Sequence, residues 1–130
     1  MNHRGKILVV DDEPNARAAL AELLSGEGYD VETAVDGLHA LPKLDKFAPD
    51  LILTDLEMPG LDGFGLIRKV KERDPEPAVV VMSALPAHDV AAELRSGTAG
   101  YLLKPINLRN LFHVIEHAIA RPLHSGPATQ

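Results

Sequence analysis

Residues 6–14 read KILVVDDEP, an apolar run that leads directly into three acidic residues and a proline. Four consecutive apolar residues at 7–10 are typical of a strand buried on both faces, and Pro14 suits the first turn of a helix. Adjacent carboxylates repel one another, so Asp11, Asp12 and Glu13 are costly at the end of a buried strand. The stretch therefore predicts a strand-to-helix turn whose concentrated negative charge needs a chemical reason.

The same strand-then-helix pattern continues along the chain. Further candidate strands lie at residues 31–34, 51–54, 78–82 and 101–103, and three of the five runs are nearly all apolar. Five strands that alternate with five helices predict a parallel sheet with right-handed crossovers and helices on both faces. The five helical patterns are expected between these strands and after the last one. The first begins at Pro14 and ends at 26–28, the second covers 37–46, and the third begins after a cap at Asp62. The fourth covers 86–97, and the fifth begins after a cap at Asn107 and ends before Pro122.

Two of these helices carry further predictions. The apolar positions expected to face the core are Ala16, Leu20, Leu23 and Leu24 in the first helix, and Leu108, Leu111, Ile115 and Ile119 in the last. In the second helix, Pro42 removes a backbone donor and crowds the preceding turn, which predicts a kink or a shortened helix. A tolerated irregularity at the surface is the alternative that we favour.

Composition excludes several classes of protein. The chain has 130 residues, a formal net charge of -6 and no cysteine, so disulfides and thiolate zinc sites are ruled out. The negative charge argues against direct binding to nucleic acid or anionic membranes, and no apolar run approaches the roughly 20 residues that span a bilayer. We expect one cytoplasmic domain over residues 1–120, with 121–130 as a disordered tail or the start of a linker.

Polar side chains follow three further strands. In an open parallel sheet, ligands bind beyond the carboxyl ends of the strands, and the order 2-1-3-4-5 makes the first and third strands neighbours. Asp55 would then meet Asp11 and Asp12, and three hard carboxylates without cysteine favour Mg²⁺. Ser83 and Lys104 end the fourth and fifth strands at the same edge. A metal and a lysine can hold phosphoryl oxygens while a carboxylate attacks phosphorus, which explains the gathered charge.

Four motifs in order complete the pattern: ILVVDDE at 7–13, LILTDLEMPGLDG at 51–63, VVVMSA at 79–84 and YLLKP at 101–105. With these motifs the chain resembles the receiver domains of two-component response regulators, over residues 6–120. The resemblance implies a flavodoxin-like fold similar to that of the chemotaxis regulators. It also implies transfer of a phosphoryl group from a phosphohistidine, with a sensor histidine kinase or a phosphotransfer protein as partner.

The resemblance assigns roles to individual residues. Asp55 would be the phosphoacceptor, and the Mg²⁺ ligands would be Asp11, Asp12, Asp55 and the backbone carbonyl of Glu57. Lys104 and the Ser83 hydroxyl would hold the phosphoryl oxygens, together with the backbone N–H groups of Glu57 and Ala84. Ser83 and Tyr101 would form the switch, and the Lys104–Pro105 peptide bond would be cis.

The resemblance also implies how a signal leaves the domain. Phosphorylation would alter the face built from the fourth helix, fifth strand and fifth helix, and so control a partner or output domain. Gly100 stands where the family often has an acid, which weakens the match to members that dimerise through this face, although a phosphorylation-dependent dimer stays possible. The sequence leaves open whether the chain acts alone or belongs to a longer regulator.

Three other classes of protein deserve comparison. A flavin-binding protein of this fold would need a hydroxyl- and glycine-rich phosphate loop after the first strand, where DDEP would repel phosphate. A dehalogenase-type phosphatase would carry a D-x-D nucleophile loop there, whereas this chain has DDE. A pseudo-receiver that binds partners without phosphorylation would lack some of the five key positions, and all five are present, so this alternative survives only if Asp55 fails to accept phosphate.

Overall fold

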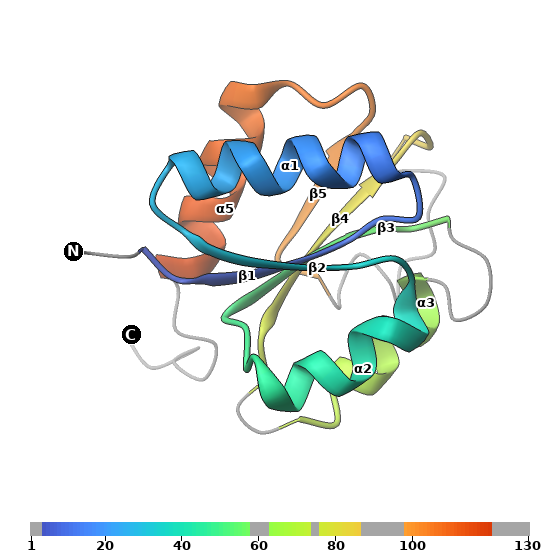
Figure 1. Cartoon of the computed structure of the whole chain (residues 1–130). Coiled ribbons are helices and arrows are strands. Elements are labelled where there is room, and N and C mark those ends of the chain that lie inside the picture. The colour runs from blue at the N-terminus through green and yellow to red at the C-terminus, as the bar shows by residue number, and fades with distance from the viewer. Residues whose placement is uncertain (1–3, 58–62, 74–75, 87–97, 121–130) are drawn as a thin grey trace, which may run out of the picture.

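Five parallel strands form one sheet in the order β2-β1-β3-β4-β5, as predicted (Figure 1). The computed structural model describes residues 4–57, 63–73, 76–86 and 98–120. The predicted cap at Asp62, the predicted helix over 86–97 and the tail at 121–130 lie wholly or largely outside these residues. The elements are β1 (Lys6–Val10), α1 (Pro14–Gly26), β2 (Asp30–Ala34), α2 (Gly37–Lys46), β3 (Leu51–Asp55), α3 (Gly63–Val70), β4 (Ala78–Ser83), β5 (Gly100–Leu103) and α5 (Leu108–Ala120).

The sheet separates two apolar cores. Helices α1 and α5 cover one face, and α2 and α3 cover the other (Figure 1). In β1, Ile7 and Val9 belong to the first core while Leu8 and Val10 belong to the second. Because successive side chains point to opposite faces, the central strands must be apolar at every position, and β1, β3 and β4 are buried almost throughout.

Side-chain caps begin three of the helices. Glu13 accepts a hydrogen bond from the Ala16 backbone at the start of α1, and Asp36 accepts one from the His39 backbone at 2.9 Å before α2. The predicted cap at Asn107 is confirmed, since its Oδ1 accepts a hydrogen bond from the Asn110 backbone at 3.0 Å. Each cap satisfies a backbone donor that a helix leaves free in its first turn.

The structure corrects two predicted core positions. Leu23 is 36% exposed and Leu108 is 46% exposed, so the buried faces of α1 and α5 are narrower than the apolar pattern predicted. Neighbouring residues such as Leu20, Leu24 and Leu111 are buried because they lie closest to the sheet. Helix α2 runs the full predicted length, from 37 to 46, with the exposed Pro42 inside it. Pro42 is therefore tolerated at the surface, as the favoured alternative predicted, and the helix is not shortened.

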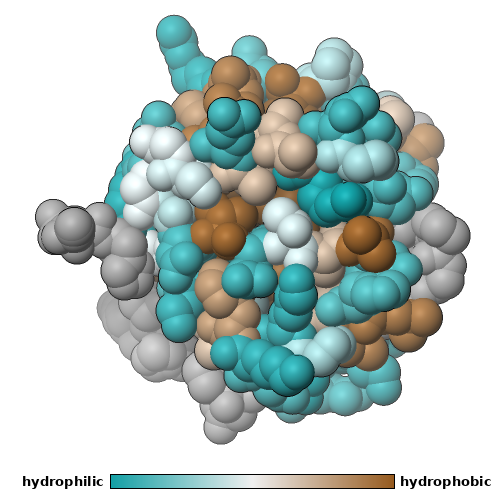
Figure 2. Space-filling model, viewed as in Figure 1, coloured by the Kyte–Doolittle hydropathy of each residue, from teal (hydrophilic) through white to brown (hydrophobic). Residues whose placement is uncertain are grey.

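Hydrophilic residues cover most of the side that shows the β2 edge, and hydrophobic residues lie among them in small separate patches (Figure 2). Two apolar residues near this edge are exposed: Val35, in the connection between β2 and α2, and Leu38, in the first turn of α2. Within the described ranges, no helix has both the length and the apolar character needed to cross a membrane.

Candidate functional site

Three carboxylates converge where β1 and β3 end. Asp11 and Asp12 follow β1, and Asp55 is the last residue of β3, the neighbouring strand. One oxygen from each can be chosen so that all three lie within 4.8 Å of one another. Asp11 and Asp55 are buried, at 2% and 5% exposure, while Asp12 is exposed. Strand order alone creates this cluster, because parallel neighbours end at the same edge of the sheet.

Burial makes the charge on Asp11 unfavourable. Burial raises the pKa of Asp11, the hydrogen bond from the Glu13 backbone lowers it, and the carboxylate of Asp55 raises it again, so that the pKa ends above its ordinary value. Because this rise occurs only on folding, the metal-free fold loses stability as pH increases from the usual aspartate range through the raised pKa. A cation in the cluster would remove the penalty.

The cluster fits a hard divalent cation. All three side chains offer carboxylate oxygens, which are the ligands that Mg²⁺ prefers. Asp12 is exposed to water, and Mg²⁺ usually keeps several water molecules in its coordination shell. The residues present therefore satisfy the chemistry of a magnesium site.

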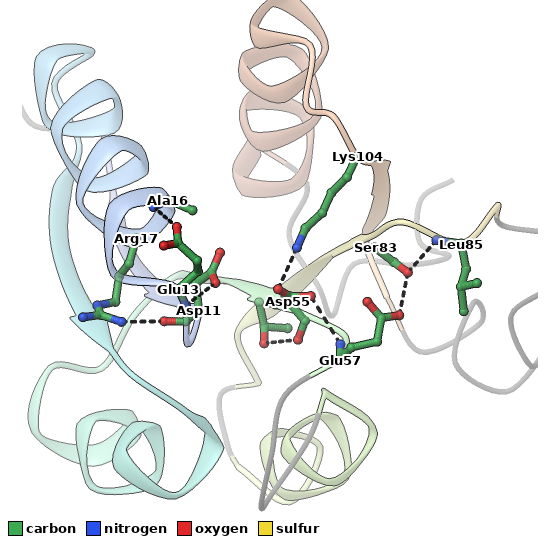
Figure 3. Close-up of polar contacts among 10 residues, drawn as sticks. Asp11, Glu13, Ala16, Arg17, Asp55, Glu57, Ser83, Leu85 and Lys104 are labelled. Carbon is green, nitrogen blue, oxygen red and sulfur yellow. Dashed lines mark hydrogen bonds and ion pairs between the residues drawn. The ribbon is translucent and has the colours of Figure 1, made fainter.

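Lys104 supplies the positive charge at this edge. Its Nζ lies 2.7 Å from Oδ2 of Asp55, reaching across from the end of β5 (Figure 3). Burial alone would lower the pKa of Lys104, but the hydrogen bond and charge of Asp55, helped by the charges of Asp11 and Glu57, hold that pKa above its ordinary value. The ammonium group is therefore charged at neutral pH. The Lys104–Pro105 peptide bond is cis.

Ser83 lies on the other side of Asp55, at the end of β4. Its hydroxyl donates a hydrogen bond to the Glu57 carboxylate at 2.8 Å and accepts one from the Leu85 backbone at 3.0 Å (Figure 3). The backbone N–H of Glu57 donates to Oδ1 of Asp55 at 3.3 Å. Ala84 follows Ser83 and is exposed. The edge thus carries a hydroxyl, an ammonium group and a backbone donor around one carboxylate.

Tyr101 connects this edge to the surface of β5. The ring is half-buried against the core formed with α2 and α3, and its hydroxyl donates to the Leu85 carbonyl oxygen. Leu85 is also the residue whose N–H donates to Ser83. Ser83 and Tyr101 are therefore linked through a single residue.

Two contacts at the site were absent from the predictions. Arg17 of α1 donates to the backbone carbonyl of Asp11 at 2.8 Å, and the Glu57 side chain accepts the Ser83 proton. Glu57 and Ser83 are 26 positions apart, so no local pattern signals their contact. The position of Arg17, one turn into the helix that follows the acids, is the only sequence signal for the other.

The fold and the site together define a class of protein: a doubly wound α/β domain with an acidic cluster and a lysine at its switch point. Residues 7–116 match the model of the response regulator receiver domain family, and this chain belongs to that family. Receiver domains are the aspartate-phosphorylated, Mg²⁺-binding components of two-component systems.

Relatives extend the comparison. The chain is 37% identical over 126 residues to the transcriptional regulatory protein ZraR of Klebsiella oxytoca, an alignment that covers 95% of this chain and 28% of ZraR. It is 35% identical over 118 residues to the DNA-binding transcriptional regulator NtrC of Escherichia coli K12, with 90% and 25% covered. The chain thus spans about a quarter of the length of these relatives.

Two solved structures match this chain along nearly their whole length. A response regulator receiver domain protein from Clostridium thermocellum is 30% identical with a TM-score of 0.79, covering 88% of this chain and 93% of that chain. The response regulator TrrA of Thermotoga maritima, solved in complex with Mg²⁺ and BeF, is 32% identical with a TM-score of 0.77, covering 85% and 96%.

Proposed function

We propose that Asp55 accepts a phosphoryl group from the phosphohistidine of a sensor histidine kinase or phosphotransfer protein. The observation that carries this proposal is the position of the Asp55 carboxylate, buried between Asp11, Asp12 and the ammonium group of Lys104 at 2.7 Å. Such a donor would place the chain in the cytoplasm with the kinase.

The reaction needs a nucleophile and a way to hold charge. A carboxylate oxygen of Asp55 forms the new bond to phosphorus while the P–N bond of the donor breaks, and its electron pair returns to the imidazole nitrogen. Lys104 would pair with phosphoryl oxygens, and the Ser83 hydroxyl and the N–H groups of Glu57 and Ala84 would donate to them.

The metal would be held by the carboxylates of Asp11, Asp12 and Asp55 and by the backbone carbonyl of Glu57. Bound Mg²⁺ would offset the negative charge that builds up between the carboxylates and the incoming phosphoryl oxygens. The domain would be phosphorylated on Asp55 and later dephosphorylated, so it would act as a phosphoacceptor that assists both reactions rather than as a conventional enzyme.

The phosphorylated domain would control an output. ZraR and NtrC are named as transcriptional regulators, so a DNA-binding output in a longer protein is one form that this could take. The signal would leave through the surface of β5 and α5, where Tyr101 lies, and would reach a partner protein, an output domain or a second phosphorylated copy.

Incubation with acetyl phosphate and Mg²⁺ tests the assignment. Intact-mass measurement should show one phosphoryl group on the parent and none on Asp55→Asn, because the amide is not a nucleophile for phosphorus. An adduct of equal size on the variant would place the phosphoryl group elsewhere. No adduct on the parent, with either acetyl phosphate or a phosphohistidine donor, would favour the alternative of a pseudo-receiver that binds partners without phosphorylation.

A further inference from the structure

The single hydroxyl proton of Ser83 is already in use. It is donated to Oε2 of Glu57 at 2.8 Å, while the oxygen accepts the Leu85 N–H at 3.0 Å. Ser83 itself is fully buried, so water does not compete for this proton. A hydroxyl group has one proton to donate. Ser83 cannot donate it to a phosphoryl oxygen on Asp55 and to Glu57 at once.

Glu57 lies between the two groups that must meet. Its backbone N–H points to Oδ1 of Asp55 at 3.3 Å, and its carboxylate turns to Ser83 (Figure 3). The main chain of Glu57 therefore faces the phosphoacceptor while its side chain holds the hydroxyl. Hydrogen bonds to charged acceptors are stronger than those to neutral ones, although the exposure of Glu57 to water weakens this one.

We propose that the Glu57 carboxylate competes with the phosphoryl group for the Ser83 hydroxyl and thereby slows phosphorylation of Asp55. This rests on the function proposed above and adds a positioning role for a side chain that acts through Ser83. Before the phosphoryl group arrives, Ser83 is held by Glu57. When the group is transferred, the Ser83–Glu57 hydrogen bond must break, and its loss is part of the barrier.

Two substitutions separate hydrogen bonding from charge. Glu57→Gln and Glu57→Ala remove the same charge, but only glutamine keeps an oxygen that can accept the Ser83 proton. We expect Glu57→Ala to raise the rate of phosphorylation by acetyl phosphate about fivefold, and Glu57→Gln to raise it less, because the hydrogen bond that must break is absent only in the first. Glu22→Gln, an exposed site on α1, controls for net charge and should leave the rate unchanged.

The Ser83→Ala background tests whether Glu57 acts through the hydroxyl. In that background, Glu57→Ala should change the rate by less than about twofold, since no proton remains to compete for. An equal gain in both backgrounds, or equal rates for Glu57→Gln and Glu57→Ala, would mean that charge alone acts and would overturn the proposal.

A second measurement needs no phosphoryl donor. Chemical unfolding of the parent, both single alanine variants and the double variant should give a coupling that changes the folding equilibrium about three- to tenfold. A coupling of zero would mean that the contact is not held in solution and would also overturn the proposal. Failure of the parent to become phosphorylated would refute the proposed function, whereas normal phosphorylation with an unchanged rate in Glu57→Ala would refute only the role of Glu57.

Discussion

At the scale of the residue, the site is an unbalanced group of charges. Asp11 and Asp55 are buried beside the exposed Asp12, and Lys104 is the cation that contacts Asp55. Burial, and after it the negative charges of Asp55 and Asp12, raise the pKa of Asp11, and the positive charge of Lys104 does not fully offset that rise. The metal-free domain therefore carries electrostatic strain that a divalent cation would relieve.

We expect Asp12→Asn to lose most of the stabilisation that Mg²⁺ provides. In the parent, Mg²⁺ at about 100 times its Kd should add about 2.7 kcal/mol to the free energy of unfolding. Because Asp12 is exposed, its replacement should leave the metal-free fold nearly as stable as before. Thermal unfolding with and without Mg²⁺ measures the difference.

Asp30→Asn provides the matched control for Asp12→Asn. Asp30 is also exposed, but it lies at the start of β2, the opposite end of the sheet from the site. This variant should keep the full increase in melting temperature with Mg²⁺. Equal increases in the two variants would place the metal away from the predicted cluster.

At the scale of the element, α5 lies unusually close to β5. A Cβ added to Gly100 would come within 2.5 Å of Cγ1 of Val114 on α5. Valine is branched at Cβ and has few rotamers to choose from, so it cannot easily turn away. Gly100 thus permits the helix to pack here, which gives a structural reason for glycine at a position where the family often has an acid.

Gly100→Ala should destabilise the domain by about 1–3 kcal/mol, since overpacking outweighs the smaller gain from a less flexible unfolded chain. Denaturant unfolding measures the change, and Val114→Ala in the same chain should restore part of it. Gly26→Ala is the control, because nothing lies within 4 Å of the added Cβ. If the two glycine variants were equally stable, close packing of Val114 would not be the reason for Gly100.

At the scale of the whole molecule, a chain of contacts joins the acidic edge to the surface of β5. Ser83 accepts the Leu85 N–H, and the Leu85 carbonyl oxygen accepts the Tyr101 hydroxyl. Movement of Ser83 toward a phosphoryl group would disturb both hydrogen bonds. The domain would then shift between two packings, driven by their difference in affinity for the phosphoryl group.

Addition of beryllofluoride and Mg²⁺ should change the NMR signals of the Tyr101 ring, as the ring leaves Leu85 and rotates inward. The chain has two tyrosines, and Tyr29 is buried beside Arg4, away from the site, so its ring serves as an internal reference. The same addition to Asp55→Asn should leave both rings unchanged. A Tyr101 ring that does not respond in the parent would refute the link between Ser83 and Tyr101.

The sheet and the positions of the acidic residues could be predicted from the amino-acid sequence. Each predicted strand agrees with the observed one to within one residue at either end. For β1, β3 and β4 the reason is that a strand buried on both faces is apolar throughout and stops where the apolar run stops. Parallel order then brings Asp11, Asp12 and Asp55 together, since all three follow or end neighbouring strands. These features depend on local composition and on topology.

Which side chains contact one another depends on the packing of the whole domain. Apolar periodicity predicts Leu23 and Leu108 in the core, but both are exposed, because α1 and α5 bury narrower faces that contain Leu20, Leu24 and Leu111. Two contacts join residues on different elements: the hydrogen bond from Ser83 to Glu57, and the close packing of Val114 against Gly100. Such contacts depend on side-chain rotamers and on the spacing between elements, which are set only when the whole core packs.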